Sequence, residues 1–182
     1  TGAVVPTLDI NNAVTIATLT VTTAGDDVDI DIASGVTLTV TNAVTLAGDS
    51  ILELIAVADG GAETLAFSGG LTLNGTSVLR FTNNSGSVTG TVTAGANGVT
   101  IDAIGTATVA TLTPSNNINL NIAAGKSLTI TNAVTVPTGK IVTMTGTNDA
   151  SAETLVISGG LTLNGAAAEL NITGDNTTAM VV

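Results

Sequence analysis

The sequence predicts an all-β protein, and most simply a β-solenoid, from three observations. Short segments alternate apolar and polar residues, glycine-containing pairs separate these segments, and aromatic residues make up only 1% of the 182 residues. Alternation at a period of two is typical of a strand with one buried face. An interior without large rings suits a thin core that is filled by short side chains.

The alternating segments recur at intervals of about 8–12 residues, as in other all-β chains. Examples are VDIDI at 28–32, VTLTV at 36–40, LTL at 71–73, SLTI at 127–130 and LTL at 161–163. Val, Leu and Ile then share one face, and Thr, Asp and Asn share the other. Gly-Gly, Asn-Gly and Gly-Asp pairs supply the positive-φ positions of tight turns. No segment sustains an apolar helical stripe, so we expect no helix longer than about two turns.

The chain repeats itself. Residues 32–75 and 122–165 align without gaps and are identical at 24 of 44 positions. The similarity continues on both sides at slightly different offsets. The sequence therefore predicts two tandem copies, residues 1–92 and 93–182, with the second copy continuous with the first.

Two architectures fit this pattern: one continuous β-solenoid, or two tandem immunoglobulin-like β-sandwiches. The absence of Trp, Tyr and Cys favours the solenoid, because no large side chain fills the wide gap between two packed sheets. A coil of roughly 18–30 residues would give on the order of 6–10 rungs at the usual strand spacing. The expected core residues are Leu38, Phe67, Leu73, Leu128, Ile157 and Leu163.

The string SGGLTLNG occurs at 68–75 and again at 158–165, among threonine-rich strands and without any cysteine. These features resemble the passenger repeats of bacterial autotransporter adhesins and filamentous-haemagglutinin-type β-helical exoproteins. The resemblance implies a right-handed β-helix, exposure at the cell surface, and a role in adhesion or matrix assembly. The chain differs from that pattern in lacking the usual aromatic residue of a longer repeat.

Composition argues against several functions. The net charge is −11 and the three cations, Arg80, Lys126 and Lys140, are scattered, so we expect neither nucleic-acid binding nor attraction to anionic lipids. No window contains the roughly 18 unbroken apolar residues of a membrane span. Without His, Cys or Tyr, the commonest general bases and activated nucleophiles are missing, so we expect no enzyme activity.

One acidic segment is a candidate metal site. Alternation places Asp27, Asp29 and Asp31 on one outward face, about 7 Å apart along the strand. Oxygen-rich ladders of this kind can bind Ca²⁺. The second copy has asparagine at the three equivalent positions, 117, 119 and 121, which favours a structural ladder of stacked polar side chains instead. No other cofactor is expected.

These observations together predict a non-enzymatic structural protein, extracellular or at the cell surface, that assembles head to tail with copies of itself. The apolar, uncharged end segments would make the contact, through Val4 and Val5 at one end and Val181 and Val182 at the other. Two alternatives remain open. One is an adhesin passenger fragment that binds surface glycans or a receptor, and the other is an ice-binding protein that uses its Thr-x-Thr rows.

Overall fold

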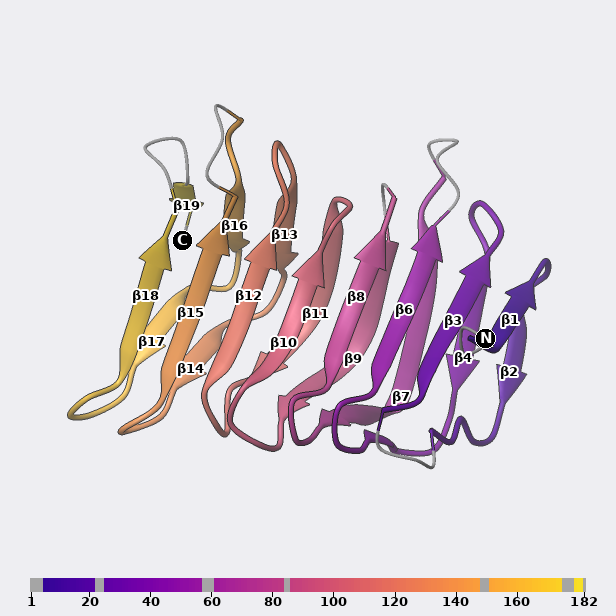
Figure 1. Cartoon of the computed structure of the whole chain (residues 1–182), viewed down its shortest axis with the longest axis horizontal. Coiled ribbons are helices and arrows are strands. Elements are labelled where there is room, and N and C mark those ends of the chain that lie inside the picture. Colours follow the sequence, from indigo (N-terminus) through magenta and orange to yellow (C-terminus); the bar gives the residue numbers. More distant parts are fainter. Residues whose placement is uncertain are drawn as a thin grey trace.

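The computed structural model describes residues 5–21, 25–56, 61–83, 86–147, 151–174 and 179–181, with only the backbone described at 179 and 180. These residues form nineteen β-strands and no helix. Every strand pair is parallel, which rules out immunoglobulin-like sandwiches, whose sheets are antiparallel. The predicted all-β solenoid is confirmed (Figure 1).

The first sheet contains eight strands, one from each successive coil (Figure 1). In spatial order these strands are β1 (Thr7–Ile10), β3 (Asp27–Ile32), β6 (Ile51–Ala56), β8 (Val78–Thr82), β10 (Val99–Ala103), β12 (Ile118–Ile122), β15 (Ile141–Gly146) and β18 (Glu169–Thr173). Val99 pairs with Ile118, 19 residues further on, and Val142 pairs with Leu170, 28 residues further on. Coil length therefore varies within the range that the sequence predicted.

The second sheet lies behind the first and is built from the return strands. Its order is β2 (Val14–Ile16), β4 (Thr37–Val40), β7 (Glu63–Leu73), β9 (Gly86–Ala94), β11 (Ala107–Thr113), β13 (Ser127–Ile130), β16 (Thr154–Ile157) and β19 (Ala179–Val181). The boundary predicted between residues 92 and 93 falls inside β9, and both sheets run past it without interruption. The two copies thus share one continuous coil.

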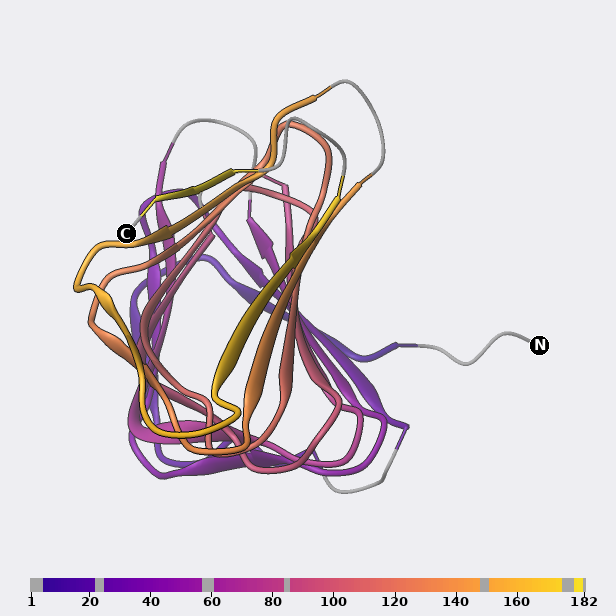
Figure 2. The same cartoon turned by 90° about the vertical axis from the view of Figure 1, so that its left-hand side faces the viewer.

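A third, narrower face gives the coil its three-sided cross-section (Figure 2). It is formed by the C-terminal parts of β7, β9 and β11 together with β5 (Val44–Leu46), β14 (Val134–Val136) and β17 (Leu161–Leu163). The chain ascends along the first sheet and descends behind it as it advances from β1 to β18, so the coil is right-handed (Figures 1 and 2).

The SGGLTLNG strings form the corner between the second sheet and the third face. A Cβ atom on Gly69 would lie 2.3 Å from the backbone nitrogen of Ala43, and one on Gly159 would lie 2.1 Å from that of Ala133. The next glycine of each string, Gly70 and Gly160, has a positive φ. The first glycine therefore permits close contact with the preceding coil, and the second permits the turn.

Alternation correctly predicts most of the core. Leu38, Phe67, Leu73, Leu128 and Ile157 are all at most 1% exposed and point into the coil.

The prediction for Leu163 is wrong, because its side chain is 48% exposed. Leu73, its counterpart in the first copy, lies between the paired strands β5 and β9. Leu163 lies on β17, which pairs only with β14 within the described residues. A residue can thus occupy an inward-facing position of the alternating pattern (an inward phase) and still be exposed, when no further coil of the described chain covers it.

Candidate interaction surfaces

The three faces of the coil carry different side chains. On the first sheet, the outward positions include all the exposed or half-buried charged residues of the described strands: Asp9, Asp27, Asp29, Asp31, Glu53, Arg80, Asp102 and Glu169. Among the described strands of the other two faces, the single charged residue is Glu63, which is fully buried. The solenoid therefore has one acidic face and two neutral ones.

Arg80 lies between two carboxylates on the acidic face. Its Nε atom donates a hydrogen bond to Asp102 Oδ2 at 3.0 Å, and its guanidinium lies 3.6 Å from Glu53 Oε2. Partial burial lowers the pKa of Arg80, but the hydrogen bond and charge of Asp102, together with Glu53, outweigh this effect and raise it. Arg80 therefore stays protonated and neutralises part of the face.

The candidate calcium ligands Asp27, Asp29 and Asp31 lie half-buried on the outward side of β3, as alternation predicted. Burial raises the pKa of Asp29, and Glu53 and Asp27 raise it further, while Arg80 acts in the opposite direction. Within the part of the chain that the structure describes, no group of three or more acidic side chains is placed to hold a metal ion.

A shared hydrogen bond indicates what this ladder does. Asp27 Oδ1 accepts a hydrogen bond from the backbone N–H of Ile51 at 3.2 Å. In the second copy, Asn117 Oδ1 accepts the equivalent bond from Ile141 at 3.0 Å. A carboxylate and an amide fulfil the same role, so the bond needs an oxygen acceptor and no charge. This pair favours the structural interpretation of the ladder over calcium binding.

The third face carries a regular row of hydroxyl groups, which we call the threonine column. It contains one outward threonine from each strand segment of that face: Thr45, Thr72, Thr93, Thr113, Thr135 and Thr162. The first four are in direct register across β5, β7, β9 and β11, and the last two are paired across β14 and β17. All six are exposed or half-buried, and their apolar neighbours point inward.

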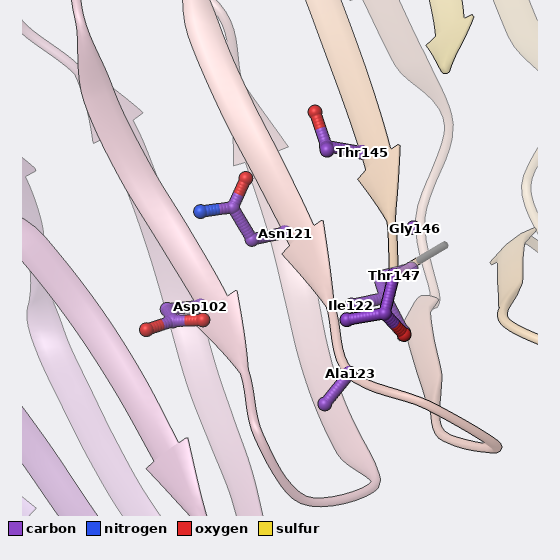
Figure 3. Close-up of a pocket in the computed structure, with 7 residues that line it drawn as sticks. All are labelled: Asp102, Asn121, Ile122, Ala123, Thr145, Gly146 and Thr147. Carbon is purple, nitrogen blue, oxygen red and sulfur yellow. The ribbon is translucent and has the colours of Figure 1, made fainter. Parts of the chain in front are cut away.

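A shallow hollow opens on the acidic face (Figure 3). It is lined by Asp102, Asn121, Ile122, Ala123, Thr145, Gly146 and Thr147, at the ends of β10, β12 and β15. Asp102 is the one ionisable group among these residues, and it is already paired with Arg80. One lining hydroxyl, that of Thr147, also has an acidic partner, because it donates a hydrogen bond to the carboxylate of Glu153.

Two buried carboxylates were not predicted from the sequence. Glu63 and Glu153 occupy equivalent positions in the two copies, and both are fully buried. Glu153 Oε1 accepts a hydrogen bond from Thr147 Oγ1 at 2.9 Å. Both glutamates are two residues before an inward-facing leucine, Leu65 or Leu155, so alternation did place them on the inward side. The sequence interpretation read only their recurrence, as a consequence of duplication, because a carboxylate is rarely fully buried.

Both ends of the coil expose apolar side chains. Val5 and Val14 are 37% and 38% exposed at the first end, where β1 and β2 are the outermost strands. At the other end Ile172, Leu163 and Val181 are 42%, 48% and 53% exposed.

The structure places the predicted assembly residues as follows. Val4 and Val182 lie outside the described residues. Val181 pairs with Val156, a residue of the outer face, so the Val181 side chain belongs to that face as well. Ile172 and Leu163, which the sequence interpretation did not assign to the end, are the exposed residues with inward phase.

Comparisons with protein-family models, with curated proteins and with solved structures found no match to this chain. Among the residues that the structure describes, no helix is long and apolar enough to cross a membrane.

Proposed function

We propose that this chain is a structural module of an extracellular assembly, a rigid solenoid that extends by end-to-end association with further copies. The observation that carries the proposal is the exposure of inward-phase side chains on the outermost coil. Leu163 and Ile172 continue the core columns of Val136 and Met144, which are fully buried one coil earlier. A further coil at this end would bury them in the same way.

The backbone supports the same association. Among the described strands, β1 and β18 are the outermost strands of the first sheet, and β2 and β19 those of the second. Within the described residues no strand pairs with the outer edge of any of them, and an edge with unpaired N–H and C=O groups favours pairing with another strand. The two ends of the coil differ, so their contact is heterologous. Such contacts produce open filaments rather than closed oligomers.

We also propose that the chain has no enzyme activity and that it is extracellular. The sequence has no His, Cys or Tyr, and the faces consist mainly of short strand-forming side chains. The location rests on the resemblance to adhesin passenger repeats and on the acidic composition, which keeps neighbouring rods soluble.

Lysine substitution at Ile172 tests this association. The wild-type chain should form elongated species that grow with concentration, measured by light scattering and negative-stain microscopy. Ile172→Lys should remain monomeric, because stacking would bury an unpaired charge. Ile104→Lys is the matched control, since Ile104 is 43% exposed but lies midway along the rod. A monomeric wild type at high concentration, or assembly of Ile172→Lys, would contradict the proposal.

The threonine column favours a second candidate function, the binding of ice. Within the group Thr45, Thr72, Thr93 and Thr113, and within the pair Thr135 and Thr162, the hydroxyls repeat at the strand spacing of about 4.8 Å, close to the repeat of the ice lattice, and each is accompanied by a methyl group. No charge interrupts the described part of this face. Ice-recrystallisation assays test this function: Thr93→Lys should abolish inhibition, and Thr100→Lys, on the acidic face, should not. If the wild-type chain has no effect on ice growth, this candidate fails.

A further inference from the structure

We infer that the contact between copies is a specific strand pairing, in which β18 of one copy adds to β1 of the next in the register that joins β8 and β10 within the chain. This inference rests on the proposed function and specifies its partner, a second copy, and its geometry. It follows from the equivalence of two pairs of strands.

The first equivalence relates β1 to β10. Thr7 pairs with Asp29, and Thr100 pairs with Asn119. Asp29 and Asn119 occupy the same place in the two copies. Thr7 and Thr100 are therefore equivalent. The free edge of β1, at the first end of the coil, corresponds to the edge of β10 that pairs with β8.

The second equivalence relates β18 to β8. Ile51 pairs with Val78, and Ile141 pairs with Glu169. Ile51 and Ile141 are equivalent residues of the two copies, so Glu169 matches Val78. The free edge of β18 is thus the counterpart of the β8 edge, which is occupied by β10 within the chain.

The internal junction sets the register of the external one. Val78 pairs with Thr100 within the chain. By equivalence, four residues of β18 face four residues of the next copy's β1: Glu169 faces Thr7, Leu170 faces Leu8, Asn171 faces Asp9 and Ile172 faces Ile10. In this register the apolar pairs continue the core, and the polar pairs continue the outward face.

Burial supports this register. Ile172 is 42% exposed at one end, and Leu8 is only partly buried at the other. The pairing places Leu170 over Leu8 and Ile172 over Ile10, which covers the exposed surface of Ile172 and the partly exposed surface of Leu8. A slip of one residue would direct these side chains to the acidic face.

Charge separates this register from one of the two slips of two residues, which preserve the alternation. In the inferred register neither carboxylate of the two strands faces another, because Glu169 faces Thr7 and Asp9 faces Asn171. Moving β1 by two residues toward its N-terminus places Glu169 directly opposite Asp9. Like charges in directly opposed positions destabilise a strand pair.

The second sheet is consistent with the same junction. Ser87 pairs with Thr108 within the chain, where β9 meets β11. The pairing of Thr154 with Ala179 makes β19 the counterpart of β9, and that of Thr15 with Thr39 makes β2 the counterpart of β11. The backbone of β19 therefore adds to β2 of the next copy at the same time as β18 adds to β1.

Cysteine cross-linking tests the register, and the chain has no cysteine of its own. Directly opposed residues of neighbouring strands lie about 4.8 Å apart, within the Cα–Cα range of a disulfide. The test variant combines Asp9→Cys with Asn171→Cys. The off-register control combines Thr7→Cys with Thr173→Cys, which the inferred register separates by four residues along the strand. Arg80→Cys with Asp102→Cys is the positive control for a directly opposed pair within one chain.

Under mild oxidation, the Asp9/Asn171 variant should give a ladder of covalent dimers, trimers and longer species on a non-reducing gel, and the Thr7/Thr173 variant should give at least tenfold less. If wild-type chains assemble but the off-register pair cross-links equally well, or the matched pair does not cross-link, the register is wrong and end-to-end association stands. If the wild-type chain does not assemble at all, both the register and the proposed function fail.

Discussion

Arg80 and Asp102 lie directly opposite each other on adjacent strands, 22 residues apart in sequence, and are joined by a 3.0 Å hydrogen bond. Glu53 occupies the opposed position on the other side of Arg80. One cation on β8 thus lies between a carboxylate on β6 and a carboxylate on β10. Arg80 is the single arginine of the chain, and it contacts two carboxylates of the acidic face.

Replacement of Arg80 by methionine should lower the free energy of unfolding by about 1 kcal/mol, because Glu53 and Asp102 lose the charge between them. The loss should shrink at high salt, which screens the remaining repulsion. Urea denaturation at low and high ionic strength measures both effects. Lys140→Met is the control, since Lys140 Nζ bonds to the neutral Asn116. Equal losses in the two variants would refute this role of Arg80.

The raised pKa of Asp29 predicts that the stability of the fold depends on pH. Its pKa is raised above the ordinary value of 3.8, first by burial and then by Glu53 and Asp27. The folded protein therefore binds this proton more tightly than the unfolded chain does, so the contribution of Asp29 to stability is most favourable at low pH. It falls as the pH rises through 3.8 and the raised pKa.

We accordingly expect Asp29→Asn to be more stable than the wild type at pH 7, with a difference that disappears below pH 3.8. Thermal melts from pH 3 to pH 7 measure this. Asn119→Asp, at the equivalent position of the second copy, faces only Thr100 and Thr143 and should change stability less. A less stable Asp29→Asn variant at pH 7 would show that the carboxylate is favourable there.

Gly159, at the corner between the second sheet and the third face, should not tolerate a side chain. Gly159→Ala should destabilise the fold by several kcal/mol, because the added Cβ would overlap the backbone of Asn132 and Ala133 on the preceding coil. Backbone atoms cannot move aside as a flexible side chain can. Ser158→Ala, one residue earlier and exposed, should cost little. Equal midpoints of chemical denaturation for the two variants would mean that the corner can relax.

Much of the fold could be predicted from local patterns. Alternation determines which face of a strand is buried, and it correctly identified Leu38 and Phe67 as core residues and Asp29 as an outward one. The pairing partners could not be predicted, because coil length varies from 19 to 28 residues and register depends on each turn. The contact of Arg80 with Asp102 and the collection of charge on one face both follow from that register.

The exposure of Leu163 at the end of the coil could not be predicted from the local sequence either. Leu73 and Leu163 are in identical sequence surroundings, LTLNG, yet one is fully buried and the other is 48% exposed. Burial on a solenoid depends on the coil above and the coil below. A sequence pattern specifies only the phase of the side chain.

The same two leucines give a matched pair of substitutions. Leu73→Ala should cost about 2–5 kcal/mol, because it opens a cavity between two covered coils. Leu163→Ala should cost less than about 1 kcal/mol in the dilute monomer, since nearly half of the side chain already contacts water. Chemical denaturation at low protein concentration measures both values.

Assembly should make the Leu163→Ala substitution more costly than it is in the monomer. If the next copy covers β17 as well as β18 and β19, Leu163 becomes a core residue, so Leu163→Ala should also weaken end-to-end association and shift assembly to higher protein concentration. Leu73→Ala should leave the concentration dependence of assembly unchanged under conditions where the variant remains folded. If Leu163→Ala assembles like the wild type, Leu163 does not lie in the interface, and the stacked coil does not continue the core at this position.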